Sequence, residues 1–129
     1  MILVDSSVWI EFFRRDSSLD LEAAVDLEEV VTCLPVVQEV LQGFDDQRTY
    51  RLAREAMFAF PVVESPLSEE VFLMAVDLFR SARRAGFTIR SSVDCLIGAC
   101  ALQNSLTVVH HDRDFDALAR ISPLEVRRV

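Results

Sequence analysis

The sequence has 129 residues, of which 51% are hydrophobic, and this suffices for one folded domain with a buried core. No apolar run approaches the roughly 18 residues that cross a bilayer, and the start lacks the basic segment of a signal peptide, so we expect a cytoplasmic protein without membrane contact. Acidic residues outnumber basic ones by 21 to 13 and give a net charge of −8. This excess disfavours nucleic-acid binding unless bound cations neutralise part of it.

The hydrophobic pattern predicts alternating strands and helices in the first half of the chain. Ser6 and Ser7 are expected to cap the first helix, Pro35 suits the first position of another, and Pro61 indicates an edge strand because proline cannot donate to a ladder. The predicted elements are a strand over 2–4, helices over 6–15 and 19–29, a buried strand over 30–34, helices over 35–43 and 45–58, and a strand over 60–63.

The second half continues the alternation. Its predicted elements are helices over 68–84 and 91–103, a strand over 106–109, a helix over 112–120 and a strand over 124–126. The longest helix has acids in its first turn and ends in Arg83 and Arg84 before Gly86, which suits the helix dipole. Strands that alternate with helices predict an α/β fold with a mostly parallel central sheet, covered by helices on both faces.

Five acidic residues are expected near the carboxyl ends of the strands, where parallel α/β sheets bind ligands. Asp5 ends the first strand, and Asp112 and Asp114 follow the fourth. Glu39 lies one turn into the helix after the second strand, and Asp94 lies in the first turn of its helix. Carboxylates gathered there would raise one another's pKa unless a divalent cation bound them. An all-oxygen set suits Mg²⁺, with Mn²⁺ as a possible substitute.

Each acid also has a purely structural interpretation. Asp5 and Asp112 can be turn or cap residues, and Glu39 can be a surface acid of a helix. Asp94 can close a capping box that begins at Ser91. Cys33, Cys95 and Cys100 lie among apolar residues and are expected to be buried reduced thiols rather than zinc ligands. Periodicity alone leaves both interpretations of the acids open.

Four segments resemble the motifs of PIN-domain toxins of the VapC type. They are Ile-Leu-Val-Asp-Ser-Ser-Val-Trp-Ile (2–10), Val-Val-Gln-Glu-Val-Leu-Gln-Gly (36–43), Ser-Val-Asp-Cys-Leu-Ile-Gly-Ala (92–99) and His-His-Asp-Arg-Asp-Phe (110–115). Order, spacing and total length agree over nearly the whole chain. The resemblance implies a single PIN domain over residues 1–129 with a three-layer α/β/α fold.

The resemblance also implies roles for individual residues. The four catalytic metal ligands would be Asp5, Glu39, Asp94 and Asp112. Asp114 would be an additional or supporting ligand, and Ser7 would orient Asp5 or a metal-bound water. The family often has threonine or serine where His110 stands, so the role of that hydroxyl is missing or replaced. We expect surface or packing roles for His110 and His111.

The implied activity is magnesium-dependent hydrolysis of RNA by a metal-activated water, in the toxin of a type II toxin–antitoxin pair. Such toxins form homodimers and are silenced by a small antitoxin whose C-terminal segment fills the active-site groove. Trp9, Phe12 and Phe13 can contact such a segment, although packing in the core is the other interpretation. A PIN nuclease of RNA processing without an antitoxin remains an alternative, as does an inert PIN scaffold that binds RNA or a partner protein.

Arginine supplies every basic residue of the sequence, and two groups are candidates for RNA contacts because the guanidinium pairs bidentately with phosphate. They are Arg48, Arg51 and Arg54 on one helix, and Arg80, Arg83, Arg84 and Arg90 near the end of another. A solvated helix face is the alternative interpretation.

Three other folds with acids above a parallel sheet are excluded by single residues. A haloacid-dehalogenase-type enzyme needs an aspartate where Ser7 stands, and a response-regulator receiver domain needs a lysine, which this sequence lacks. A dinucleotide-binding domain needs a glycine-rich turn after the first strand, where Asp5-Ser6-Ser7 stands.

Overall fold

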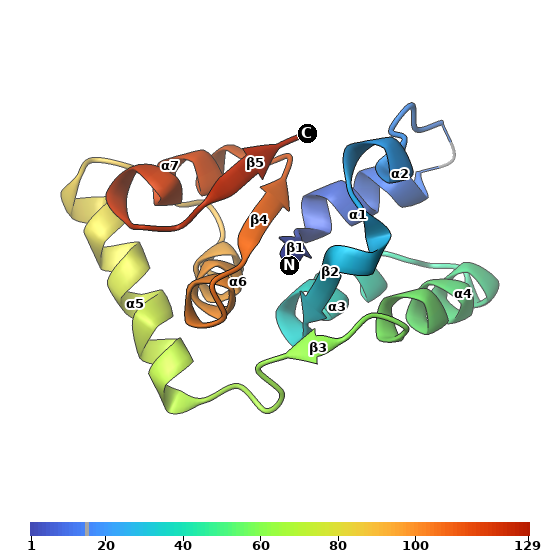
Figure 1. Cartoon of the computed structure of the whole chain (residues 1–129), viewed down its shortest axis with the longest axis horizontal. Coiled ribbons are helices and arrows are strands. Elements are labelled where there is room, and N and C mark those ends of the chain that lie inside the picture. The colour runs from blue at the N-terminus through green and yellow to red at the C-terminus, as the bar shows by residue number, and fades with distance from the viewer. Residues whose placement is uncertain (15) are drawn as a thin grey trace.

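The computed structural model describes residues 1–14 and 16–129 (Figure 1). Its strands are β1 (Ile2–Val4), β2 (Val30–Cys33), β3 (Val62–Val63), β4 (Thr107–His110) and β5 (Val126–Arg128). Its helices are α1 (Ser6–Phe13), α2 (Leu21–Ala24), α3 (Leu34–Leu41), α4 (Gln47–Phe58), α5 (Glu69–Arg84), α6 (Ser92–Gln103), α7 (Arg113–Ile121) and the 3₁₀ turn η1 (Leu27–Glu29).

The strands form one parallel sheet in the order β3-β2-β1-β4-β5. Helices α5, α6 and α7 gather on one side of it, and α1, α2 and α4 lie on the other (Figure 1). Every residue of β1 and β2 is buried, as expected for central strands of a sheet covered on both faces. The predicted α/β fold is therefore confirmed, and β3 is the edge strand that Pro61 indicated.

The sheet order creates a switch point between β1 and β4. These strands are neighbours, but β1 leads to β2 on one side and β4 leads to β5 on the other. The chains that leave them diverge, and such a point opens a crevice at the carboxyl ends of the strands. Asp5 lies there because it directly follows β1. Asp112 lies there because it follows β4 after a single residue, His111.

The helix expected over 19–29 is broken in two, and this prediction was wrong. Two aspartates each cap a separate short turn: Asp20 accepts the Ala23 amide at 3.2 Å, and Asp26 accepts the Glu28 amide at 3.0 Å. Between them Val25 is extended and buried. Two competing N-caps within seven residues start two turns rather than one helix.

The first helix and the last strand also differ from the prediction. Asp5, rather than Ser6 or Ser7, is the N-cap of α1, which ends at Phe13; the predicted end at Arg15 lies outside the described residues. The last strand is β5 rather than 124–126, because Leu124 is buried in the core. Arg127 and Arg128 of β5 face solvent, so the hydrophobic pattern did not predict this edge strand.

The class expectations from composition can be compared with the structure directly. Cys33, Cys95 and Cys100 are buried free thiols, as predicted. Among the described residues, the helices lack the combination of length and apolar character that spanning a bilayer requires.

Candidate metal centre

Asp5 lies at the junction of β1 and α1 and is almost completely buried, with 1% of its surface exposed. Its Oδ2 accepts the backbone N–H of Ser7 at 3.0 Å and also the Ser7 hydroxyl. Its Oδ1 is buried and has no hydrogen-bond partner among the described residues. Ser7 thus makes the contact expected of a residue that orients Asp5, and it leaves one carboxylate oxygen free for a ligand.

Glu39 and Asp94 meet Asp5 from two other helices. One carboxylate oxygen from each of the three residues lies within 4.8 Å of the others, close enough to share a cation. Helix α3 brings Glu39, and the Ser6 hydroxyl donates to its Oε1 at 2.8 Å. Sequence reasoning treated Ser6 only as a helix cap and missed this contact. The signal was its position between Asp5 and Ser7 in the first motif.

Asp94 is buried in the first turn of α6, and its Oδ2 has no partner within the described part of the chain. The capping box that offered a structural role for Asp94 does not form, because the Ser91 side chain makes no cap hydrogen bond in the same part. Asp94 also lies within 4.8 Å, oxygen to oxygen, of Asp112 and Asp114. It therefore joins two overlapping groups of three acids.

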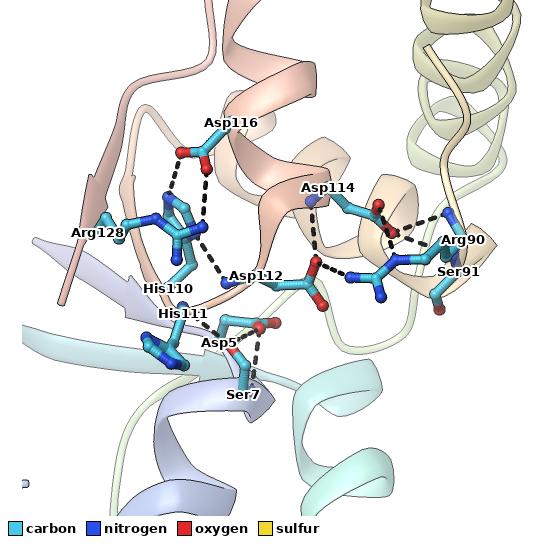
Figure 2. Close-up of polar contacts among 10 residues, drawn as sticks. All are labelled: Asp5, Ser7, Arg90, Ser91, His110, His111, Asp112, Asp114, Asp116 and Arg128. Atoms are coloured by element: carbon cyan, nitrogen blue, oxygen red, sulfur yellow. Dashed lines mark hydrogen bonds and ion pairs between the residues drawn. The ribbon is translucent and has the colours of Figure 1, made fainter.

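Asp112 and Asp114 hold the far side of the centre (Figure 2). Asp112 caps α7 by accepting the Asp114 amide at 2.9 Å through Oδ1. Asp114 is buried, and its Oδ2 accepts the backbone amides of Arg90 at 3.0 Å and Ser91 at 3.2 Å. These two bonds tie the start of α6, and with it Asp94, to α7.

The Arg90 side chain sits over the same two acids. Its Nη2 donates to Asp112 Oδ1 at 3.1 Å, and its Nε lies 3.8 Å from Asp114 Oδ1. The guanidinium therefore partly neutralises this edge of the cluster, whereas the Asp5 and Glu39 side has no arginine in an ion pair among the described residues. Half of the Arg90 side chain stays exposed, so its guanidinium remains accessible from solvent.

Burial makes the cluster costly when its acids are ionised without a cation. Burial, with a smaller contribution from Glu39, raises the pKa of Asp5 to about 6 even though Ser7 opposes the rise. Burial also raises the pKa of Asp94 to about 9, assisted by a hydrogen bond with Asp114 and by the charges of Asp5 and Asp112. A divalent cation offsets both effects.

The donor set fits a hard divalent cation. All five acids present oxygen, two of those oxygens are buried and unpaired among the described residues, and the thiol of Cys95 is not part of either group. Oxygen-only sites select Mg²⁺ or Mn²⁺ over zinc. The acidic cluster is therefore chemically suited to hold such an ion.

His110 ends β4, and His111 follows it in the turn that leads to α7. His110 is fully buried, where burial lowers its pKa, and His111 is exposed. The expected packing role of His110 and surface position of His111 are confirmed in this respect, but both also make polar contacts that sequence reasoning did not find. The backbone N–H of His111 donates to Ser7 Oγ at 3.0 Å, and His110 Nδ1 accepts the Asp112 amide at 3.2 Å.

The remaining candidate arginines lie on exposed helix faces. Arg83 stacks over the Phe79 ring at 4.9 Å, and Arg84 donates to Ser81 Oγ at 3.3 Å. The exposed members are Arg48, Arg51 and Arg54 on α4, and Arg80, Arg83 and Arg84 on α5. Trp9 is buried against neighbouring aromatic rings, whereas Phe12 remains 41% exposed.

Comparison with known proteins decides the family. Residues 2–121 match the model of the PIN domain family. The chain belongs to the PIN domain family. A VapC ribonuclease of Mycobacterium bovis and ribonuclease VapC11 of Mycobacterium tuberculosis are each 36% identical to it, over 97% of this chain and 96% of the relative.

Solved structures agree with this PIN-domain fold. VapBC-5 of Mycobacterium tuberculosis, a member of the VapBC family of toxin–antitoxin systems, superposes with a TM-score of 0.76 at 23% identity. The superposition covers 99% of this chain and 98% of the other. The resemblance read from the four motifs is therefore confirmed, and the acids inferred from it form two overlapping groups that share Asp94.

Proposed function

We propose that this protein is a magnesium-dependent endoribonuclease and the toxin of a type II toxin–antitoxin pair. The observation that carries the proposal is the cluster of buried, partly unpaired carboxylates at the switch point of a PIN-domain chain. The sequence relatives named VapC ribonucleases support the reaction, and the VapBC complexes among the structural neighbours support the antitoxin partner. A protein that cuts RNA in this way would act in the cytoplasm.

Each acid has a distinct task in this proposal. Asp5, Glu39 and Asp94 would hold a cation at the inner side of the crevice, and Asp94 with Asp112 would face the outer side, where Asp114 supports them. The cation supplies Lewis-acid activation of water and neutralises the charge of the phosphodiester. Ser6 and Ser7 orient Glu39 and Asp5 through their hydroxyls.

Binding of RNA to a chain of net charge −8 needs local positive charge. Arg90 is placed at the rim of the crevice, with its guanidinium next to Asp112, where it can bind a phosphate beside the cation. Arg84, Arg48 and Arg51 lie farther away on exposed helix faces and would bind further phosphates along the RNA.

A homodimer is supported by the apolar face between α5 and α6. Phe72 and Val76 are about half exposed there, at 48% and 51%, and line a groove of about 360 Å³ together with Phe79 and Leu96. Apolar patches of this kind mark interaction surfaces. We propose that a second copy of the chain covers this face.

Charge along α5 matches a two-fold interface at this face. Glu69 lies at the amino-terminal end of α5, and Arg80 and Arg83 lie in its carboxyl-terminal half. A two-fold axis perpendicular to α5 would pair the helix with an antiparallel copy of itself and so set Glu69 of one copy near Arg80 and Arg83 of the other. The complementarity favours a dimer over a partner of different chemistry.

The activity is tested with purified protein and labelled RNA in Mg²⁺ and then in chelator. We expect cleavage that chelator stops, and loss of cleavage in Asp94→Ala and Asp5→Ala with circular dichroism unchanged. Wild-type-like cleavage by both variants would refute these ligands. The antitoxin partner is tested by co-expressing the small protein encoded beside the gene. If that protein does not inhibit cleavage, the chain is instead a nuclease of RNA processing.

A further inference from the structure

The turn that joins β4 to α7 contains His111 and Asp112, and two side-chain acceptors hold it (Figure 2). Ser7 Oγ accepts the backbone N–H of His111 at 3.0 Å, and His110 Nδ1 accepts the backbone N–H of Asp112 at 3.2 Å. One of these amides belongs to Asp112 itself and the other to the residue before it. The two bonds therefore restrict the direction in which the Asp112 carboxylate leaves the backbone.

The chemistry of the imidazole determines how His110 is protonated. Because Nδ1 accepts, the neutral ring must carry its proton on Nε2. Nε2 lies 3.5 Å from Asp116 Oδ1 but has no hydrogen-bond partner among the described residues, and Asp116 Oδ2 accepts from Arg128 at 3.1 Å. The Phe115 ring packs beside the imidazole, with ring centroids 5.4 Å apart, so the ring has little freedom to rotate.

Strand β5 fixes the same turn from the other side. His110 and Arg128 are register partners in the sheet, and the Val129 amide donates to the His110 carbonyl at 2.9 Å. The His111 ring Nδ1 lies 2.8 Å from the Val129 carbonyl oxygen. The end of the chain thus holds His110 in the position from which it reaches the Asp112 amide.

We propose that His110 is a positioning residue: its Nδ1 accepts the Asp112 amide and so aims the Asp112 carboxylate into the acidic cluster. A threonine or serine at this position, as the family often has, can accept the same i+2 amide through its hydroxyl. The imidazole replaces that hydroxyl on a residue whose backbone is tied to β5 and to Val129. The consequence for cation binding rests on the function proposed above, whereas the hydrogen bond itself does not.

The matched variants His110→Thr and His110→Val test the proposal. The two side chains have nearly the same shape and remove the same ring, so any cavity and its cost are shared; they differ in the hydroxyl acceptor. We expect the Mn²⁺ dissociation constant, measured by isothermal titration calorimetry, to rise about tenfold or more in His110→Val, as losses of supporting contacts do. His110→Thr should stay within about threefold of the wild type. Equal affinities in the two variants, at comparable thermal stability, would overturn the proposal.

Nuclear magnetic resonance of the metal-free wild type tests the hydrogen bond without any variant or activity. We expect ¹⁵N shifts of His110 typical of an unprotonated Nδ1 and a protonated Nε2, and slow exchange of the Asp112 amide. A protonated Nδ1 or an Asp112 amide that exchanges as fast as a free one contradicts the proposal. Absence of Mn²⁺ binding by the wild type would refute the proposed metal function instead, and these two signals would still decide the role of His110.

Discussion

Asp5 is at once a helix cap and a candidate ligand, and its two oxygens divide these tasks. Oδ2 is held by Ser7, and Oδ1 is buried and unpaired among the residues described. A cap residue is normally half solvated, so the burial of this one requires a compensating charge. Asp5 is therefore the cap that the structural interpretation expected, and its unpaired Oδ1 supports the proposed role as a metal ligand.

The pKa values of Asp5 and Asp94 predict how stability depends on pH without metal. Both values, about 6 and about 9, exceed the roughly 3.9 of an unfolded aspartate, so the folded state holds these protons more tightly. Their contribution is complete below about pH 4 and is lost as pH rises through the folded values. For Asp5 alone the loss is about 3 kcal/mol.

Chelator-treated protein should therefore unfold at a lower temperature at pH 8 than at pH 5, and Mg²⁺ should reverse the loss. Asp94→Asn removes the larger charge cost, so its metal-free form should be the more stable one at pH 8. Thermal denaturation followed by circular dichroism gives the melting temperatures. They are compared for the metal-free wild type and Asp94→Asn at pH 5 and pH 8, and for the wild type with Mg²⁺ at pH 8. A metal-free wild type that gains stability over this pH range relative to Asp94→Asn would contradict the assignment.

At the residue scale, sequence reasoning found the acids and the contact of Ser7 with Asp5, but not the contacts that support Glu39 and Asp112. The strand-end positions of Asp5 and Asp112 follow from hydrophobic patterning, and the remaining ligands from short motifs. The contacts of Ser6 with Glu39 and of His110 with Asp112 depend on side-chain directions across 33 residues or around a turn. No spacing rule encodes those directions.

At the scale of elements, Gly98 lies where α6 packs against leucine side chains of α5 and α7. A Cβ at this position would lie 3.5 Å from Leu124 Cδ2 and Leu78 Cδ1, which is ordinary contact. Gly98→Ala should thus be tolerated and gain up to about 1 kcal/mol of helix propensity. Gly98→Leu has no room and should cost about 1–3 kcal/mol. Urea denaturation of both variants checks the pair, and equal stabilities would show that packing is loose here.

The elements predicted well are those with strong apolar stripes or caps. Helix α5 begins and ends within a residue of the prediction because Ser68 caps it and Gly86, at a φ of +87°, ends it. The prediction for the region before β2 was wrong because Asp20 and Asp26 form competing caps. The prediction for β5 was wrong because its exposed arginines give an edge strand no hydrophobic pattern. Local hydrogen bonds and edge exposure leave weak patterns in hydrophobicity.

At the scale of the whole molecule, the α5–α6 face predicts the oligomeric state. Val76→Asp places a charge in the apolar groove and should convert a dimer to monomers, as measured by sedimentation velocity. Leu52→Asp is the matched control, because Leu52 is also exposed, at 58%, but lies on α4 at the other side of the sheet. A Val76→Asp protein that remains dimeric would place the interface elsewhere.

The arrangement of the sheet explains why an acidic protein can act on RNA. The switch point between β1 and β4 gathers acids from four separate segments, and we expect that concentration of negative charge to bind cations before it meets a polyanion. The most direct measurement is calorimetric titration of Mn²⁺ into the wild type and into Asp94→Asn, whose side chain belongs to both groups of acids. We predict saturable binding by the wild type and at least a tenfold loss in the variant. Equal binding by the two proteins, or none by the wild type, would contradict a cation site built on these acids.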